Sequence, residues 1–89
     1  MLLKFDQNFL KALSKIKDDK LYKRIQGVIE NCEEATSLKD INNVKKIIGF
    51  RNFYRIKLGQ YRIGFELENS TSIRFITILH RKEIYRKFP

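Results

Sequence analysis

Residues 54–65 read YRIKLGQYRIGF, and this stretch decides the fold because apolar residues recur at every second position on both sides of a glycine. A period of two predicts two β-strands, one from Phe53 to Leu58 and one from Tyr61 to Leu67. Gly59-Gln60 between them has the length of a two-residue loop, and glycine at its first position suits a type II′ turn. We therefore expect an antiparallel hairpin.

The turn also fixes which residues of the hairpin face each other. It places Lys57 opposite Arg62 and Arg55 opposite Gly64, so three cations share one face. Like charges in direct opposition cost up to about 1 kcal/mol, and an anion between them relieves that cost. We expect a phosphate there, with Gly64 leaving a recess for a backbone or base. The same alternation is also typical of solvated cations on the wet face of a half-buried sheet.

The residues before the hairpin predict one strand and two helices. Leu2 to Phe5 is a short apolar stretch, and Asp6 is placed to cap a helix. Two sets of apolar residues at helical spacing, joined by a charged turn, predict a pair of antiparallel helices. These sets are Phe9, Leu10, Leu13 and Ile16, then Leu21, Ile25, Val28, Ile29 and Cys32.

The rest of the chain completes an α+β pattern. Asn69 to Thr71 forms a second turn, Ser72 to Leu79 a further strand, and a charged tail follows from His80. Ser37 to Gly49 is compatible with either a helical turn or a short extended segment. We expect a helical hairpin packed on one face of a mainly antiparallel sheet of about four strands, with a short C-terminal tail.

Length and composition limit the classes of function. A chain of 89 residues forms one core, so residues 1–89 are expected to be a single domain. With 19 Lys and Arg against 10 Asp and Glu, the net charge of +9 favours nucleic acid first and an acidic protein second. Cys32 is the only cysteine, and no segment has the pattern of a signal peptide or membrane span. A cytoplasmic protein without membrane contacts is expected.

The tail from His80 to Phe88 adds four cations and Tyr85. An arginine beside an aromatic ring can bind a phosphate and stack a base, as in single-stranded RNA binding, although the tail can equally serve only to dock Ile84 and Phe88 on the core. A single histidine excludes a multi-His metal site, and we expect neither metal nor cofactor. His80 itself is either structural or a proton acceptor.

Residues 54–65, followed by ILHRKEIYR at residues 78–86, resemble the RelE/ParE superfamily of bacterial toxins. The shared features are a Tyr-Arg-Ile-Lys strand, a tight turn, Tyr-Arg-Ile on the next strand, then His-Arg and a C-terminal tyrosine. The order of strand, helical hairpin and sheet matches the family as well, so the similarity covers nearly the whole chain.

The resemblance implies a ribosome-dependent endonuclease that cuts mRNA in the ribosomal A site by attack of the transcript's own 2′-OH, without metal. Arg62 and Arg81 match the arginines that stabilise charge on the reacting phosphate, and Tyr85 matches the tyrosine that stacks on or orients a base. Arg55 and Lys57 match the strand cations. The tail cations Lys82 and Arg86 are expected, with Arg55, to bind RNA. The general base stays open between His80 and Lys57, because the family often has lysine in place of His80.

Two other functions are compatible with the same residues. ParE-type members share the fold and inhibit DNA gyrase without cutting RNA, and a plain RNA-binding module would use the +9 charge for affinity alone. Arg62, Arg81 and Tyr85 together favour the nuclease, since a pure binder needs no converged set. The resemblance also implies a cognate antitoxin that covers the cationic face. We expect the toxin alone to be a monomer.

Overall fold

The computed structural model describes residues 1–89, and its framework is a five-stranded sheet in the order β1-β5-β4-β3-β2. Its strands are β1 (Leu2–Phe5), β2 (Val44–Lys46), β3 (Phe53–Leu58), β4 (Tyr61–Asn69) and β5 (Ser72–His80). β1 runs parallel to β5, and every other pairing is antiparallel. The predicted α+β class and hairpin are confirmed, with one strand more than expected.

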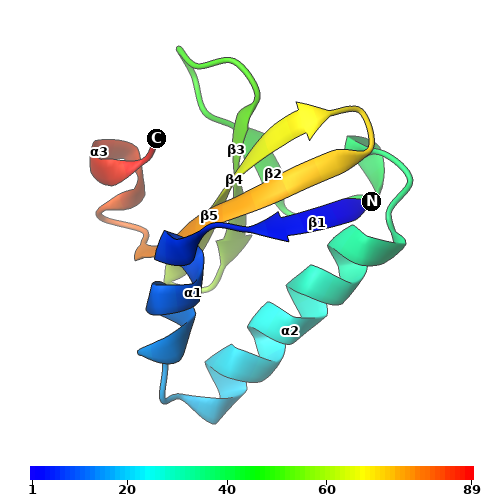
Figure 1. Cartoon of the computed structure of the whole chain (residues 1–89). Coiled ribbons are helices and arrows are strands. Elements are labelled where there is room, and N and C mark those ends of the chain that lie inside the picture. Colours follow the sequence, from blue (N-terminus) through cyan, green and yellow to red (C-terminus); the bar gives the residue numbers. More distant parts are fainter.

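Two helices cover one face of this sheet and diverge from the turn between them (Figure 1). In α1 (Gln7–Ser14) the side chain of Asp6 accepts a hydrogen bond from the backbone N–H of Asn8, as predicted for an N-cap. In α2 (Asp19–Glu34) the side chain of Asp18 caps two N–H groups. Neither these helices nor α3 (Ile84–Lys87) are long and apolar enough to cross a membrane.

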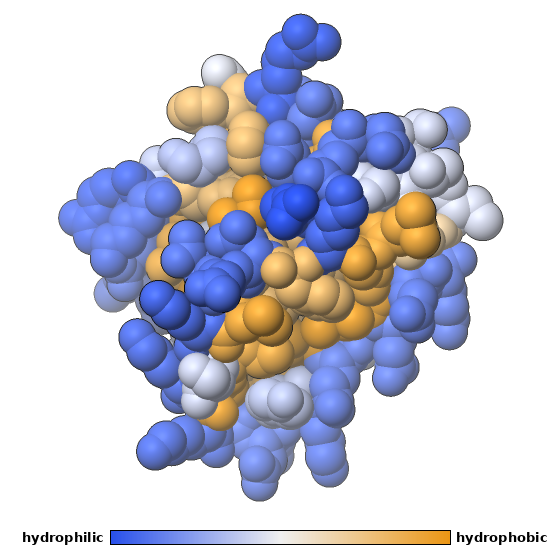
Figure 2. All heavy atoms as spheres, viewed as in Figure 1, coloured by the Kyte–Doolittle hydropathy of each residue, from blue (hydrophilic) through white to orange (hydrophobic).

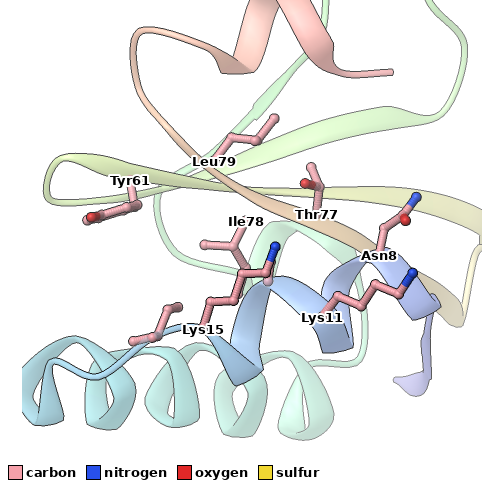
Figure 3. A pocket seen from close by; sticks show the side chains of 9 residues that line it. Asn8, Lys11, Lys15, Tyr61, Thr77, Ile78 and Leu79 are labelled. Atoms are coloured by element: carbon pink, nitrogen blue, oxygen red, sulfur yellow. The ribbon is translucent and has the colours of Figure 1, made fainter.

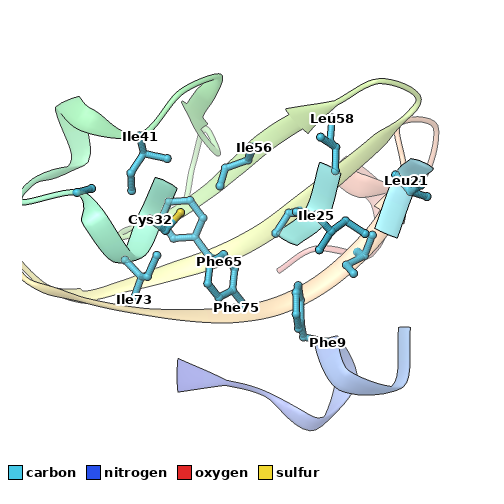
Figure 4. Close-up of a cluster of buried hydrophobic side chains, with 13 residues drawn as sticks. Phe9, Leu21, Ile25, Cys32, Ile41, Ile56, Leu58, Phe65, Ile73 and Phe75 are labelled. Atoms are coloured by element: carbon cyan, nitrogen blue, oxygen red, sulfur yellow. The ribbon is translucent and has the colours of Figure 1, made fainter. Parts of the chain in front are cut away.

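The main core lies between these helices and the sheet (Figure 4). Phe9 of α1 packs against Phe75 of β5, with ring centroids 5.3 Å apart, while Ile25 and Cys32 of α2 are fully buried above β3 and β4. Burial raises the pKa of the Cys32 thiol to about 11, so it fills the core as a neutral group. Leu10, placed on the apolar face by its spacing, is instead 49% exposed.

The segment left open by the sequence contains both alternatives. A short 3₁₀ turn, η1 (Leu38–Asp40), is followed by the edge strand β2, in which Lys45 lies opposite Arg55 of β3. A loop then returns the chain to β3, with Gly49 at a φ of 91° that favours glycine.

A second, smaller core lies on the sheet face opposite α1 and α2. There Ile84 and Phe88 of the tail are buried together with Ile47, and the short helix α3 is held against this face. The recess predicted above Gly64 is therefore wrong: a Cβ on Gly64 would lie 2.8 Å from the ring of Phe88. The space that glycine leaves in the strand is filled by the protein's own tail.

Candidate active site

Cations from three strands and one loop converge on the sheet face that carries α3. The register is the predicted one: Lys57 of β3 lies opposite Arg62 of β4, and Arg55 lies opposite Gly64. The φ of 60° at Gly59 fits the type II′ turn that sets this register. Arg81 follows β5, where its backbone N–H donates to the carbonyl of Gln60 and ties it to the same turn.

Arg62 is partly buried and is held by its own hairpin turn. Its Nη1 donates to the carbonyls of Gly59 and Tyr61, both at 2.8 Å, which hold the guanidinium against its own hairpin turn. Desolvation by burial, with nearby Arg55 and Arg81, lowers the pKa of Arg62 below its ordinary value. The group stays charged, and its Nε and Nη2 donate to no protein atom.

Tyr85 of α3 brings a hydroxyl group into the same cluster. Arg55 Nε donates to Tyr85 Oη at 3.2 Å, and Arg55 Nη1 donates to the carbonyl of Asn43 at 3.3 Å. This hydrogen bond, with the charges of Arg55, Lys45 and Arg62, lowers the pKa of the Tyr85 phenol. The phenolic proton is therefore given up more readily than in an ordinary tyrosine.

No carboxylate neutralises this cluster. The ion pairs of the molecule join Lys4 and Arg74 to Glu68, and Lys87 to Glu83. Arg55, Arg62 and Arg81 have no such partner, so their positive charges are available to an external anion. A phosphate group has the charge and the acceptor oxygens to bridge them.

The structure does not bring every predicted residue to this place. His80 pairs with Tyr61 and packs on its ring edge, with centroids 5.8 Å apart, so it lies on the α1–α2 face rather than beside Arg62. Its Nδ1 accepts a hydrogen bond from the backbone N–H of Lys82. Lys82 and Arg86 are exposed, and no hydrogen bond joins either of them to Arg62.

Lys45 is a site residue that the sequence analysis did not identify. It lies opposite Arg55 and close enough to Tyr85 to lower the pKa of the phenol. Its place follows only from the pairing of β2 with β3, in the segment whose structure the sequence left open. A lysine at this register extends the cationic strip to the sheet edge.

A cavity of about 510 Å³ lies away from the cluster, between α1 and β5 (Figure 3). Lys11 and Lys15 are its only charged side chains, and Tyr61, Ile78 and Leu79 supply most of its apolar wall. No cation of the cluster lines this cavity, and neither does Tyr85, so we place the candidate site at the cationic cluster instead.

The sequence matches the model of the family described as the ParE toxin of type II toxin-antitoxin systems, parDE, over residues 3–85. The chain belongs to the RelE/ParE superfamily of toxins. Toxin RelE3 of Methanocaldococcus jannaschii is 43% identical to this toxin over 90 residues, which cover both chains fully.

Solved structures show the same fold. The RelB–RelE antitoxin–toxin complex from Methanococcus jannaschii matches with a TM-score of 0.79 at 42% identity, covering 97% of this toxin and 99% of that chain. The archaeal RelE–RelB complex from Pyrococcus horikoshii OT3 matches with a TM-score of 0.71 at 22% identity, covering 90% and 93%. At 22% identity, the similarity to the Pyrococcus horikoshii complex shows a shared fold only.

Proposed function

We propose that this toxin is a cytoplasmic endoribonuclease that cuts mRNA in the ribosomal A site, using the 2′-OH of the substrate as nucleophile and no metal. The observation that carries the proposal is the cluster of Arg55, Arg62 and Arg81, in which Arg55 donates to the Tyr85 hydroxyl and no carboxylate is present. A surface made only for binding needs charge, whereas this one also holds a positioned phenol of lowered pKa.

The cations supply the charge stabilisation that the reaction needs. When the 2′-oxygen attacks phosphorus, the pentacoordinate transition state carries more negative charge than the substrate phosphate. The Arg62 guanidinium is held by two carbonyls before the substrate binds, and the backbone of Arg81 is tied to the hairpin turn. Preorganised cations aimed at such a charge contribute several kcal/mol.

The reaction also moves two protons. The 2′-OH loses its proton as the new P–O2′ bond forms, and the departing 5′-oxygen gains one as the P–O5′ bond breaks, which leaves a 2′,3′-cyclic phosphate. Tyr85 suits the second transfer, since its oxygen already accepts from Arg55 and its own proton is free to be donated. Lys57 opposite Arg62 is our candidate for the first transfer, because His80 lies on the other face.

We further propose that a cognate antitoxin neutralises the toxin by covering the cationic face. The solved RelB–RelE complexes are assemblies of a toxin with its antitoxin, and this chain resembles their toxin subunits over nearly all of its length. With a net charge of +9 and an unneutralised cluster, an acidic segment is the complementary partner.

The decisive test is primer extension on a reporter mRNA in a reconstituted translation system. Wild-type toxin is expected to produce cuts that require ribosomes, and Arg62→Ala to reduce the rate at least 100-fold, because removing one stabiliser of a developing oxyanion costs about that much. Arg74→Ala, which removes the same charge from an arginine paired with Glu68, is the matched control. Equal cutting by Arg62→Ala and Arg74→Ala would sink the assignment.

Inhibition of DNA gyrase is the second candidate, favoured by the match to the ParE toxin family. A supercoiling assay on the same preparations separates the two. Intact mRNA together with inhibited supercoiling would make the cluster a protein-binding surface. Salt-sensitive RNA binding without cutting or gyrase inhibition would leave a plain RNA-binding module.

A further inference from the structure

A pocket of about 400 Å³ opens directly beside the cationic cluster, between α3 and the loop that joins β2 to β3. In Figure 1 this loop extends beyond the sheet on the side where α3 lies. Ile47 and Phe88, both buried, belong to the pocket floor, while Ile48, Phe50 and Tyr85 are exposed at its rim. Its volume falls in the range of sites for small organic groups.

The rim is unusually apolar for a surface. Ile48 is 88% exposed and Tyr85 63% exposed, and both are among the seven large apolar or aromatic side chains that the molecule leaves in solvent. Exposed apolar groups gathered around a concavity mark a binding surface more often than chance exposure. The walls are aromatic on both sides, with Phe50 on the loop and Tyr85 on α3.

The side of the pocket that the β2–β3 loop forms is held in place by contacts within the protein. The backbone N–H of Ile47 donates to the carbonyl of Phe53, and the Lys46 ammonium donates to the carbonyl of Phe50. Phe50 packs edge-on against Phe53, which in turn packs edge-on against Phe88. A wall fixed in this way loses little entropy when a flat ligand enters.

We propose that this pocket takes the nucleobase of the nucleotide next to the phosphate held by the arginines, and that the β2–β3 loop selects which bases fit. Tyr85 and Lys45 belong both to the pocket and to the cationic cluster, so one nucleotide can place its phosphate and its base in adjoining sites. An apolar protein segment would fill the pocket and leave the cations unneutralised. The proposal deepens the proposed function and rests on it for the identity of the phosphate as that of RNA.

The test measures binding separately from cutting. Fluorescence anisotropy compares a labelled 2′-O-methyl hexaribonucleotide, which has no free 2′-OH to attack, with an abasic hexamer of the same charge. Stacking of one base on an aromatic ring is worth roughly tenfold in affinity, so wild-type toxin is expected to bind the base-containing strand about tenfold more tightly. Phe50→Ala and Ile48→Ser are expected to bring this ratio below about threefold, with affinity for the abasic strand unchanged.

Leu10→Ala on α1 is the matched control, because Leu10 and Phe50 are both 49% exposed and Leu10 lies outside the pocket. It is expected to keep the tenfold ratio. Ile48→Ser guards against a folding artefact, since a side chain 88% exposed contributes little to the core. A wild-type ratio near one, or an unchanged ratio in Phe50→Ala and Ile48→Ser, overturns the proposal and favours a protein segment as the occupant.

The outcome is separable from that of the cleavage assay. Suppose that wild-type toxin prefers the base-containing strand, that Phe50→Ala abolishes this preference, and that wild-type toxin cuts no mRNA. These results would support the base pocket and contradict the endonuclease activity. If wild-type toxin cuts mRNA but binds the base-containing and abasic strands equally, the endonuclease activity is supported and the base pocket is contradicted. In a toxin that passes both tests, Phe50→Ala changes the preference among A-site codons, whereas Arg62→Ala lowers cutting at every codon.

Discussion

At the scale of single residues, Tyr85 shows how a site is tuned by its neighbours. Arg55 donates to the phenolic oxygen, and Lys45 and Arg62 add positive charge nearby. Each of these favours the phenolate over the phenol, so each lowers the pKa of Tyr85. Arg55 comes first among them, because it acts through both a hydrogen bond and its charge.

This arrangement predicts the alkaline side of the pH–rate profile. Under the proposed mechanism, cutting should fall as pH rises through the Tyr85 pKa, because only a protonated phenol can donate to the leaving oxygen. The fall should begin below the ordinary tyrosine value of about 10, since the pKa of Tyr85 is lowered. Arg55→Gln removes the main cause of the lowered pKa, so the fall should move to higher pH. Single-turnover cleavage between pH 7 and 10 measures it. A profile unchanged in Arg55→Gln and Tyr85→Phe would remove the proton-donor role.

At the scale of secondary-structure elements, α3 has only four helical residues and depends on packing for its position. Ile84 and Phe88 are four residues apart on one side and are buried, which leaves Tyr85 beside them facing the cations. Phe88 can lie flat on the sheet only because position 64 has no side chain. A glycine in β4 thus fixes a tyrosine in α3.

Gly64→Ala should therefore destabilise the protein. The added methyl group would lie 2.8 Å from the Phe88 ring, and such overpacking typically costs about 1–3 kcal/mol in the free energy of unfolding. Gly27→Ala is the paired control: it is in α2, nothing lies within 4 Å of its added Cβ, and alanine should stabilise the helix by about 0.5–1 kcal/mol. Urea unfolding measures both. Equal stability of the two variants would contradict the packing of Phe88 over Gly64.

β5 and the tail differ most from what the sequence predicts. Periodicity predicted the hairpin, its register and the two helices, since each depends on neighbours close in sequence. It did not reveal that the register between β4 and β5 shifts between Gly64 and Phe65, which turns both Phe75 and Ile78 toward the helices. Such an irregularity depends on packing between strands rather than on local pattern.

The same limit applies to the site, where residues set by local pattern could be predicted and residues set by distant contacts could not. Arg55, Lys57 and Arg62 follow from the hairpin alone, whereas Lys45 required the pairing of β2. His80 looked close to Arg81 in sequence, yet the strand alternation carries its ring to the opposite face beside Tyr61. The prediction of a recess at Gly64 was wrong because Phe88, which is distant in sequence, occupies that space.

At the scale of the whole molecule, charge is distributed unevenly. Glu68 forms ion pairs with both Lys4 and Arg74, while the cluster around Tyr85 has no acidic partner. Apolar atoms gather over β1 and between the two large helices, within a hydrophilic surround (Figure 2). The net charge of +9 therefore acts mainly through surfaces other than this apolar band.

Binding of single-stranded RNA should consequently weaken steeply with salt. Each phosphate contact adds about 0.7 to the magnitude of the slope of log K against log salt concentration. Arg62→Ala should reduce that magnitude by about 0.7, and Arg74→Ala should leave it unchanged because Glu68 already pairs with Arg74. Anisotropy titrations between 50 and 300 mM KCl, roughly the range in which such slopes are measured, give both numbers. Identical slopes for the two variants would show that only total charge matters.

The parallel pairing of β1 with β5 has a consequence for the life of the protein in the cell. Leu2 finds its partner Ser72 only after most of the chain has been synthesised, so the sheet cannot close early. Until then the apolar faces of α1 and α2 have no complete sheet to cover. We therefore expect a copy that ends before β5 to expose these apolar faces and to be degraded or bound by chaperones, rather than to act as a weaker toxin.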